Sequence, residues 1–221
     1  MNSNNPFDQF DIEHLSASSI NLFMQDIPLF IVRYLAKHKA PTNPAMLRGT
    51  VIDHAIGNKT SVAQAQKEFM ALMNYEKKQG NVFDQEKAET EYNNIEKYLD
   101  IGLPFYKDLG KPISYQEKII LQFEDLPLPV LGFVDLEYKD CIRDIKTTGR
   151  MPSKVSNAHA RQVSVYAKTE GCTPVLDYIC VSSKGTEVVT YPVERIDEHI
   201  KVVRQVALAI MNLLSFSNDK Q

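Results

Sequence analysis

The sequence of 221 residues predicts an α/β fold, in which helices flank a mixed β-sheet, although an α+β sandwich has the same pattern. Three observations support this prediction. Short segments rich in Val, Ile, Phe and Thr, typical of strands, cluster between residues 113 and 193. Segments with apolar residues three or four positions apart, typical of helices, lie before, between and after them. Glycine and proline residues separate many of these segments.

The N-terminal half is predicted to be helical. Ser16 can cap a helix that runs to about Lys37, and Pro28 should kink or break it. A second helix is expected over residues 45–57, and a highly charged helical segment over residues 61–100. Three residues are then expected to break the chain: Pro104, Gly110 and Pro112.

The C-terminal half is predicted to contain the strands. They are expected over residues 113–124, 129–137, 141–148, 175–183 and 186–193, the last two forming a hairpin around Lys184-Gly185. A helix capped by Ser156 should run to about Thr169. A last amphipathic helix should run from Ile196 to Leu214.

The bulk composition is that of a globular protein, with 43% hydrophobic and 24% charged residues. We expect a single domain over residues 15–221, preceded by a flexible leader (residues 1–14) and carrying a helical insert at about residues 61–110. No apolar run reaches the roughly 18–20 residues of a membrane span, so no membrane partner is expected. The polar, acidic N-terminus does not resemble a secretory signal.

The cysteines and the net charge bear on the cellular setting and on the attraction to nucleic acid. Cys141, Cys172 and Cys180 are widely spaced and form neither a disulfide framework nor a metal-binding pattern, which predicts a reducing, cytoplasmic setting. The net charge of −3 gives no overall attraction to nucleic acid, although a local basic groove is compatible with it.

Two acids face each other in the predicted hairpin over residues 129–148. A two-residue turn at Lys139-Asp140 would pair Tyr138 with Cys141, and this register puts Asp135 directly opposite Asp144. Such partners have Cβ atoms about 4.5–5.5 Å apart, and like charges there repel. The substitution Asp144→Asn should therefore be neutral or stabilising in the absence of metal.

A lysine accompanies the acids. Side chains alternate along a strand, so Asp144 and Lys146 share one face and Ile145 points to the other. The purely structural interpretation is an exposed ion pair of Asp144 and Lys146, which contributes little stability. The apolar flanks and the second acid favour a site in which a divalent cation lies between the carboxylates.

The motifs SASSINLFMQDIPLFIVRY, LRGTVIDHAI, GFVDL, DIKTT and QVSVY occur in this order. Through these motifs and their order the chain resembles the PD-(D/E)XK nuclease superfamily, particularly its RecB-like branch of phage and CRISPR-associated exonucleases. The resemblance covers most of residues 15–193, except 61–100. It implies a restriction-endonuclease-like sheet and a metal-dependent DNA nuclease, foremost an exonuclease of phage-type recombination or repair.

The resemblance also implies partners. The first is DNA, as linear duplex ends or single strands, and a recombination protein is a further candidate. The resemblance is also compatible with an oligomer. A phage-encoded member would act in the host cytoplasm. Exonuclease or endonuclease action, polarity and the choice of DNA over RNA stay open. The alternative within the family is a catalytically inactive DNA-binding or assembly module. Outside the family it is an interaction protein whose acids form an ion-pair network.

Site residues follow from the resemblance. Asp135 and Asp144 correspond to the metal-binding acids, Lys146 to the catalytic lysine, and the carbonyl of Ile145 to a further metal ligand. Such oxygen donors suit Mg²⁺ or Mn²⁺. The family's iron–sulfur cluster is not expected, because Ile27 stands where its first cysteine would precede Pro28.

The helix over residues 45–57 departs from the family pattern. In RecB-like members a metal-binding His follows a Gly by four residues, but Asp53 stands four residues after Gly49 and His54 comes one later. Adjacent helical side chains point about 100° apart, so only one can face a metal. We favour Asp53 and keep His54 as the alternative; each could instead be a solvated surface residue.

Further family positions are less specific. Gln162 and Tyr166 match a Gln-x-x-x-Tyr element that lies beside the active site, and their spacing of four puts them on one helix face. Ser16 and Ser18 could add a phosphate contact at a helix N-terminus. Arg33 and Arg48 are candidate DNA-backbone contacts. Without the resemblance these would be packing, capping or solvated residues.

Overall fold

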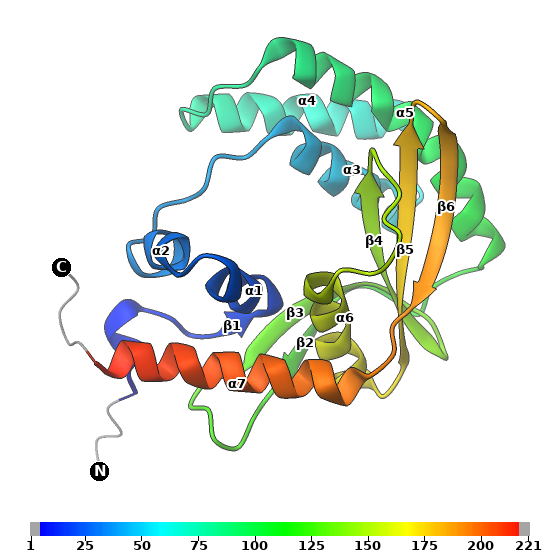
Figure 1. Ribbon diagram of the computed structural model, residues 1–221. Helices are drawn as coiled ribbons and strands as arrows, with labels where there is room; N and C mark the ends of the chain where they lie inside the picture. Colours follow the sequence, from blue (N-terminus) through cyan, green and yellow to red (C-terminus); the bar gives the residue numbers. More distant parts are fainter. Residues whose placement is uncertain (1–4, 217–221) are drawn as a thin grey trace.

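A computed structural model describes residues 5–216 and contains one mixed six-stranded sheet (Figure 1). The strand order is β1-β3-β4-β5-β6, and β2 pairs with β3. The strands are β1 (Leu15–Ser16), β2 (Ser114–Leu121), β3 (Val130–Glu137), β4 (Cys141–Thr148), β5 (Thr173–Ser182) and β6 (Gly185–Pro192). The predicted mixed sheet flanked by helices is therefore confirmed.

Seven α-helices accompany the sheet among the described residues: α1 (Ala17–Gln25), α2 (Ile27–Phe30), α3 (Pro44–Asn58), α4 (Val62–Lys78), α5 (Gln85–Asp108), α6 (Asn157–Glu170) and α7 (Ile196–Ser215). None of them is both long and apolar enough to span a membrane.

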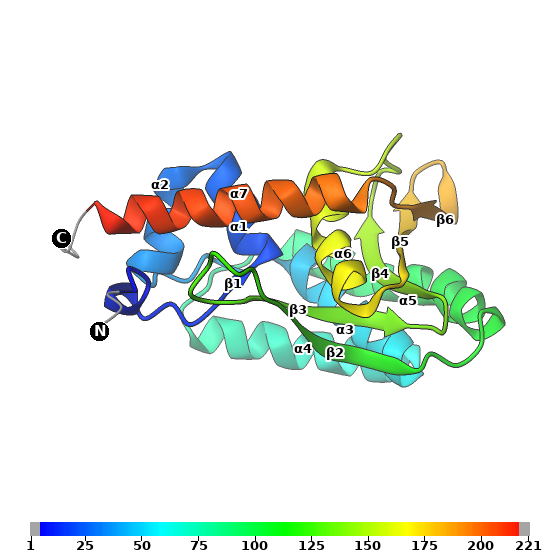
Figure 2. The same ribbon diagram turned by 90° about the horizontal axis from the view of Figure 1, so that it is seen from below.

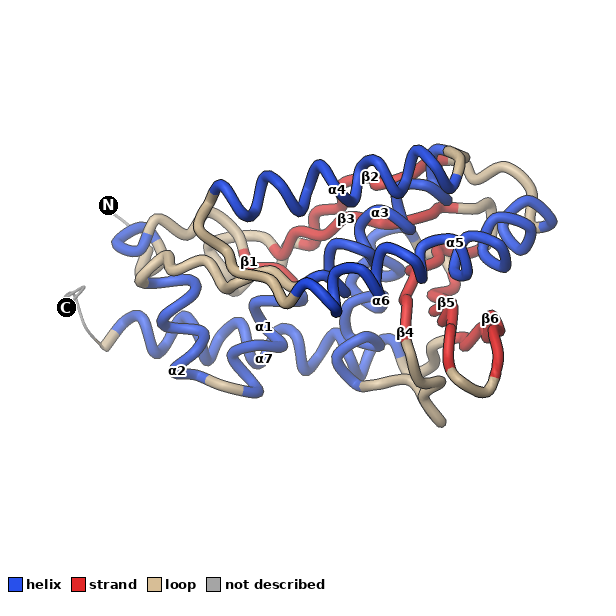
Figure 3. The backbone as a smooth tube through the Cα atoms, turned by 90° about the horizontal axis from the view of Figure 1, so that it is seen from above, coloured by secondary structure: helices blue, strands red, loops and turns tan. Residues whose placement is uncertain are grey.

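The helices form two layers with the sheet between them (Figures 2 and 3). Helices α3, α4 and α5 pack on one face through a cluster that includes Val51, Phe69 and Leu99. Helices α1, α6 and α7 pack on the other through a cluster that includes Ile20 and Val163. Each cluster also takes side chains from β3, β4 and β5, so these central strands are buried on both faces.

The central strand β3 is paired unevenly along its length. It pairs with β2 along nearly all of its residues, and with β1 at Val130 and Leu131. With β4 it pairs at Leu136 and Glu137 alone, whereas β4 pairs with β5 along its whole length. Strands β3 and β4 therefore separate between Leu136 and Asp135 of β3, and we call this place the sheet fork.

Helix starts follow the capping signals. Ser16 caps α1 in a capping box with Ser19, and Ser156 accepts a hydrogen bond from the backbone of His159 at the start of α6. The predicted break near Pro28 is confirmed: Asp26 ends α1 and caps α2, and a π-helix over Ile31–Leu35 follows.

The leader over residues 1–14 was expected to be flexible; of its described residues, Phe7, Phe10 and Ile12 are buried in the cluster that includes α1 and α7, and residues 1–4 lie outside the described residues. The prediction that Pro104 breaks the chain was wrong, because Pro104 lies inside α5, which continues to Asp108. The hydroxyl of Tyr106 donates to Asp177 Oδ2 at 3.0 Å and anchors the turn beyond the proline.

Candidate active site

The hairpin of β3 and β4 has the predicted register. The N–H of Tyr138 donates to the carbonyl of Cys141 at 2.8 Å, and Leu136 pairs with Arg143. Counting on by one residue in each strand puts Asp135 opposite Asp144, at the sheet fork. The two carboxylates therefore lie where the backbone ladder stops, with no strand between them.

Asp135 is held by uncharged donors. Its Oδ2 accepts the backbone N–H of Ile145 at 2.8 Å, and its Oδ1 accepts Nε2 of Gln116 at 3.0 Å. Burial raises the pKa of Asp135 well above its usual value, and the negative charges of Asp144 and Asp53 raise it further. The three carboxylates are thus close enough to influence one another.

Asp144 is held by a cation. It is 1% exposed, and its Oδ2 lies 2.5 Å from Nζ of Lys146. Burial opposes the charge on Lys146, but the carboxylates of Asp144 and Asp135 outweigh it and raise the pKa of the lysine. Lys146 therefore keeps its positive charge beside the acids.

Of the two residues left open on α3, the structure brings Asp53 to the acids. Its Oδ2 accepts Nε2 of Gln116 at 2.9 Å and the hydroxyl of Tyr115 at 3.2 Å. Burial, followed by the charge of Asp144, raises the pKa of Asp53 to about 6. His54 turns away, with Nδ1 2.7 Å from Oε2 of Glu68 on α4.

Helix α6 adds a polar chain to the same place. Nζ of Lys146 donates to Oε1 of Gln162 at 3.3 Å, and Nε2 of Gln162 donates to the hydroxyl of Tyr166 at 2.8 Å. The Tyr166 ring lies against Gly132 of β3 so closely that a Cβ there would be 2.3 Å from it. The Gln-x-x-x-Tyr pair is therefore a support for Lys146.

Two neighbours of the site were missed in the sequence. Gln116 lies in β2 opposite Asp135, and no turn signal fixed the register of that strand. His159 precedes Gln162 by three residues on α6, and its Nδ1 is 2.7 Å from the hydroxyl of Tyr178. Burial and the charge of Lys146 lower the pKa of His159. Its helical spacing from Gln162 was a usable signal.

Within the described residues, the remaining candidates form no hydrogen bond or ion pair with the three acids. Ser16 caps α1, Ser18 is exposed, and Arg33 is half-buried on the π-helix. Arg48, expected to contact DNA, is 6% exposed and forms an ion pair with Glu91. A direct contact of Arg48 with DNA does not fit this burial.

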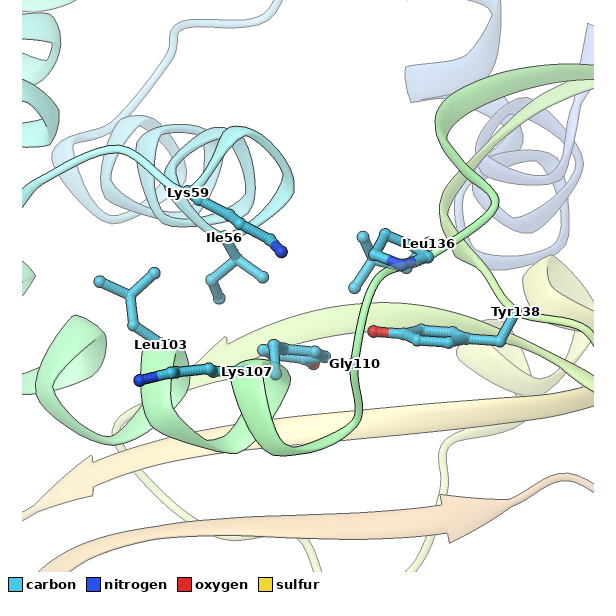
Figure 4. A pocket seen from close by; sticks show the side chains of 9 residues that line it. Ile56, Lys59, Leu103, Lys107, Gly110, Leu136 and Tyr138 are labelled. Atoms are coloured by element: carbon cyan, nitrogen blue, oxygen red, sulfur yellow. The ribbon is translucent and has the colours of Figure 1, made fainter.

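A separate pocket of about 160 Å³ lies behind the fork, between α3, α5 and β3 (Figure 4). Apolar side chains such as Ile56, Leu103 and Leu136 line it, and Lys59 and Lys107 contribute their stems. None of the acids of the fork lines this pocket.

The oxygen donors at the fork suit a hard divalent cation. Oδ1 of Asp53 is buried and has no hydrogen-bond partner, as expected of an atom that a ligand would satisfy. Within residues 5–216, no group of three Asp, Glu, His or Cys side chains is already arranged around a single ion position. Asp53 and Asp135 accept hydrogen bonds from the Gln116 amide, and Asp144 contacts Lys146. The donor types fit the ion.

Comparison of the sequence with protein-family models and with curated proteins finds no match. Among solved structures, a candidate exonuclease from Eubacterium rectale has a TM-score of 0.63 at 14% identity, over 96% of this chain and 86% of that one. The protein SSO0001 aligns over 90% of this chain and 84% of its own, with 11% identity and a TM-score of 0.42. The first likeness shows a shared fold, a mixed α/β sheet flanked by helices.

Proposed function

We propose that this protein is a divalent-metal-dependent DNA nuclease of the PD-(D/E)XK type, an exonuclease that acts in phage-like recombination or repair in the cytoplasm. The observation that carries the proposal is the gathering of Asp135, Asp144 and Lys146 at the sheet fork, with Asp53 beside them. The fold shared with a candidate exonuclease supports it.

The residues that would hold Mg²⁺ or Mn²⁺ are Asp135, Asp144 and Asp53, with the carbonyl of Ile145. When bound, such an ion lowers the pKa of a coordinated water and stabilises the departing oxygen of a phosphodiester. Lys146 would neutralise negative charge that develops on the phosphate, since it carries a positive charge beside the acids.

The other residues of the site would keep Lys146 in place. Gln162 accepts a hydrogen bond from its Nζ, and Tyr166 fixes the amide of Gln162 in turn. Because Asp144 and Gln162 both contact the ammonium, they would hold it in place before substrate binds. Arg48 has no part in this proposal.

End-labelled linear duplex, single-stranded DNA and covalently closed circular DNA, each with Mg²⁺, Mn²⁺ or EDTA, test the function. We expect loss of label from linear DNA with either metal and none in EDTA. Lys146→Ala should reduce the rate at least about 100-fold, with an unchanged far-UV circular dichroism spectrum. Lys139→Ala, which removes an exposed lysine from the same hairpin, is the matched control.

Other outcomes would decide against the proposal. Retarded migration of DNA without cleavage would indicate an inactive binding module. Cleavage of closed circles at the rate of linear DNA would exclude an exonuclease, and cleavage in EDTA would exclude the metal.

A further inference from the structure

Gln116 has a backbone conformation that is disfavoured for its residue type. Its φ is +54°, in the left-handed region, in the middle of β2. The other described non-glycine residues with positive φ lie at or just beyond the ends of helices: Asp11, Lys37, Lys59 and Arg195. Strain of this kind persists where the surrounding structure holds the residue in place, often at functional sites.

The positive φ has a consequence for the side chains. Successive residues of a strand ordinarily point to opposite faces. Tyr115 and Gln116 nevertheless both reach Oδ2 of Asp53, at 3.2 and 2.9 Å. The unusual conformation of Gln116 accounts for this, because it turns the side chain of Gln116 out of the regular alternation.

The amide of Gln116 joins two elements. Nε2 donates to Oδ2 of Asp53 on α3 and to Oδ1 of Asp135 on β3, at 2.9 and 3.0 Å. An amide nitrogen has two hydrogens, one for each carboxylate. The link gives each acid a hydrogen bond without adding charge, while Oδ1 of Asp53 stays buried without a hydrogen-bond partner.

We infer that Gln116 is a positioning residue that orients the carboxylates of Asp53 and Asp135 for a divalent cation. By holding Oδ2 of Asp53, the amide fixes the rotation of that carboxylate and presents Oδ1 to the ion. The inference rests on the proposed function. Replacing a residue that holds a metal ligand in this way typically lowers metal affinity or activity about 10–100-fold.

Two substitutions separate the amide from the backbone. Gly accepts a positive φ without strain but has no side chain, so Gln116→Gly removes the link alone. Asn tolerates the left-handed region better than most residues, but its side chain is one methylene shorter, so Gln116→Asn keeps an amide that cannot span both acids. Ile120→Gly, at an exposed position of the same strand, is the control for a glycine in β2.

The experiment measures Mn²⁺ binding by calorimetry without DNA, and thermal unfolding in EDTA. We expect Gln116→Gly and Gln116→Asn to bind Mn²⁺ about 10–100-fold more weakly than the wild-type protein. The metal-free melting temperature of Gln116→Gly should not fall below that of Ile120→Gly, which should bind Mn²⁺ as the wild-type protein does.

The contrary results distinguish a failure of the proposed function from a failure of the role of Gln116. If the wild-type protein binds no Mn²⁺, both the proposed function and the role of Gln116 are wrong. If it binds Mn²⁺ and both Gln116 variants bind equally well, the positioning role alone is wrong. A lower melting temperature for Gln116→Gly with unchanged Mn²⁺ affinity would make the residue purely structural and also overturns the inference.

Discussion

Asp144 lies in contact with the cation of Lys146, whereas Asp135 accepts hydrogen bonds from the uncharged donors Gln116 and Ile145. Loss of the Asp144 charge would leave a largely buried ammonium without its partner. The expectation that Asp144→Asn is neutral or stabilising without metal therefore does not fit the structure. Relief of repulsion is expected at Asp135 instead, whose pKa is raised first by burial and then by the charges of Asp144 and Asp53.

We predict unequal effects for the two amide substitutions in EDTA. Asp144→Asn should lower the free energy of unfolding by roughly 2 kcal/mol, less than the roughly 3–5 kcal/mol of a fully buried pair, because the Lys146 side chain keeps 23% of its exposure. Asp135→Asn should destabilise less, because the relief of repulsion offsets the loss of one of the two hydrogen bonds that Asp135 accepts from Gln116 and Ile145. Urea denaturation of both variants measures this, and equal destabilisation by the two would contradict it.

Asp53 predicts a pH dependence of the metal-free protein. Its pKa rises from 3.8 to about 6 on folding, so the folded state binds the proton more tightly than the unfolded state. Its contribution to stability is full below about pH 4 and is lost as the pH rises through about 6. Urea midpoints at several pH values in EDTA should show this fall, and Asp53→Asn should reduce it, while Asp135, whose pKa burial also raises, keeps its own share. Asp100→Asn, at an exposed position, should leave the slope unchanged.

At the scale of elements, the contact of α6 with β3 holds the polar chain that ends at Lys146. Gly132→Ala would place a Cβ 2.3 Å from Cε1 of Tyr166, so the ring must move, and Gln162 with it. We predict a loss of about 1–3 kcal/mol and a reduced nuclease rate.

Gly149→Ala is the matched control for this prediction. A Cβ at Gly149 has no described neighbour closer than 3.9 Å, so stability should change by less than about 0.5 kcal/mol. Full activity of Gly132→Ala would show that the position of Tyr166 does not matter to Lys146.

The elements also show what could be predicted from the sequence. The register of β3 and β4 was predictable, because a two-residue turn fixes which residues pair. The continuation of α5 past Pro104 was not, since it depends on Tyr106 meeting Asp177, 71 residues away. Gln116 could not be found either, because eight residues separate β2 from β3 and no residue type signals a left-handed glutamine.

At the scale of the whole molecule, the described part of the N-terminal segment belongs to the domain. Phe7 is fully buried beneath α1 and α7. We predict that Phe7→Ala lowers the free energy of unfolding by about 3–5 kcal/mol, measured by urea denaturation. Phe216→Ala, which removes a side chain that is 88% exposed, should have little effect. A neutral Phe7→Ala would restore the idea of a loose leader.

Arg48 connects helix α3, which carries Asp53, to the charged helix α5. One side chain pairs with Glu91 of α5, donates to Oγ1 of Thr147 at 3.2 Å and stacks over Tyr98 at 4.4 Å. It stands five residues before Asp53 on α3 and next to Gly49, where even a Cβ would touch Thr147. In a protein that lacks residues 61–110, α3 would lose the contacts of Arg48 with Glu91 and Tyr98 and could rotate about its axis. The β3–β4 hairpin would still form, but the carboxylate of Asp53 would no longer be held at one position beside it.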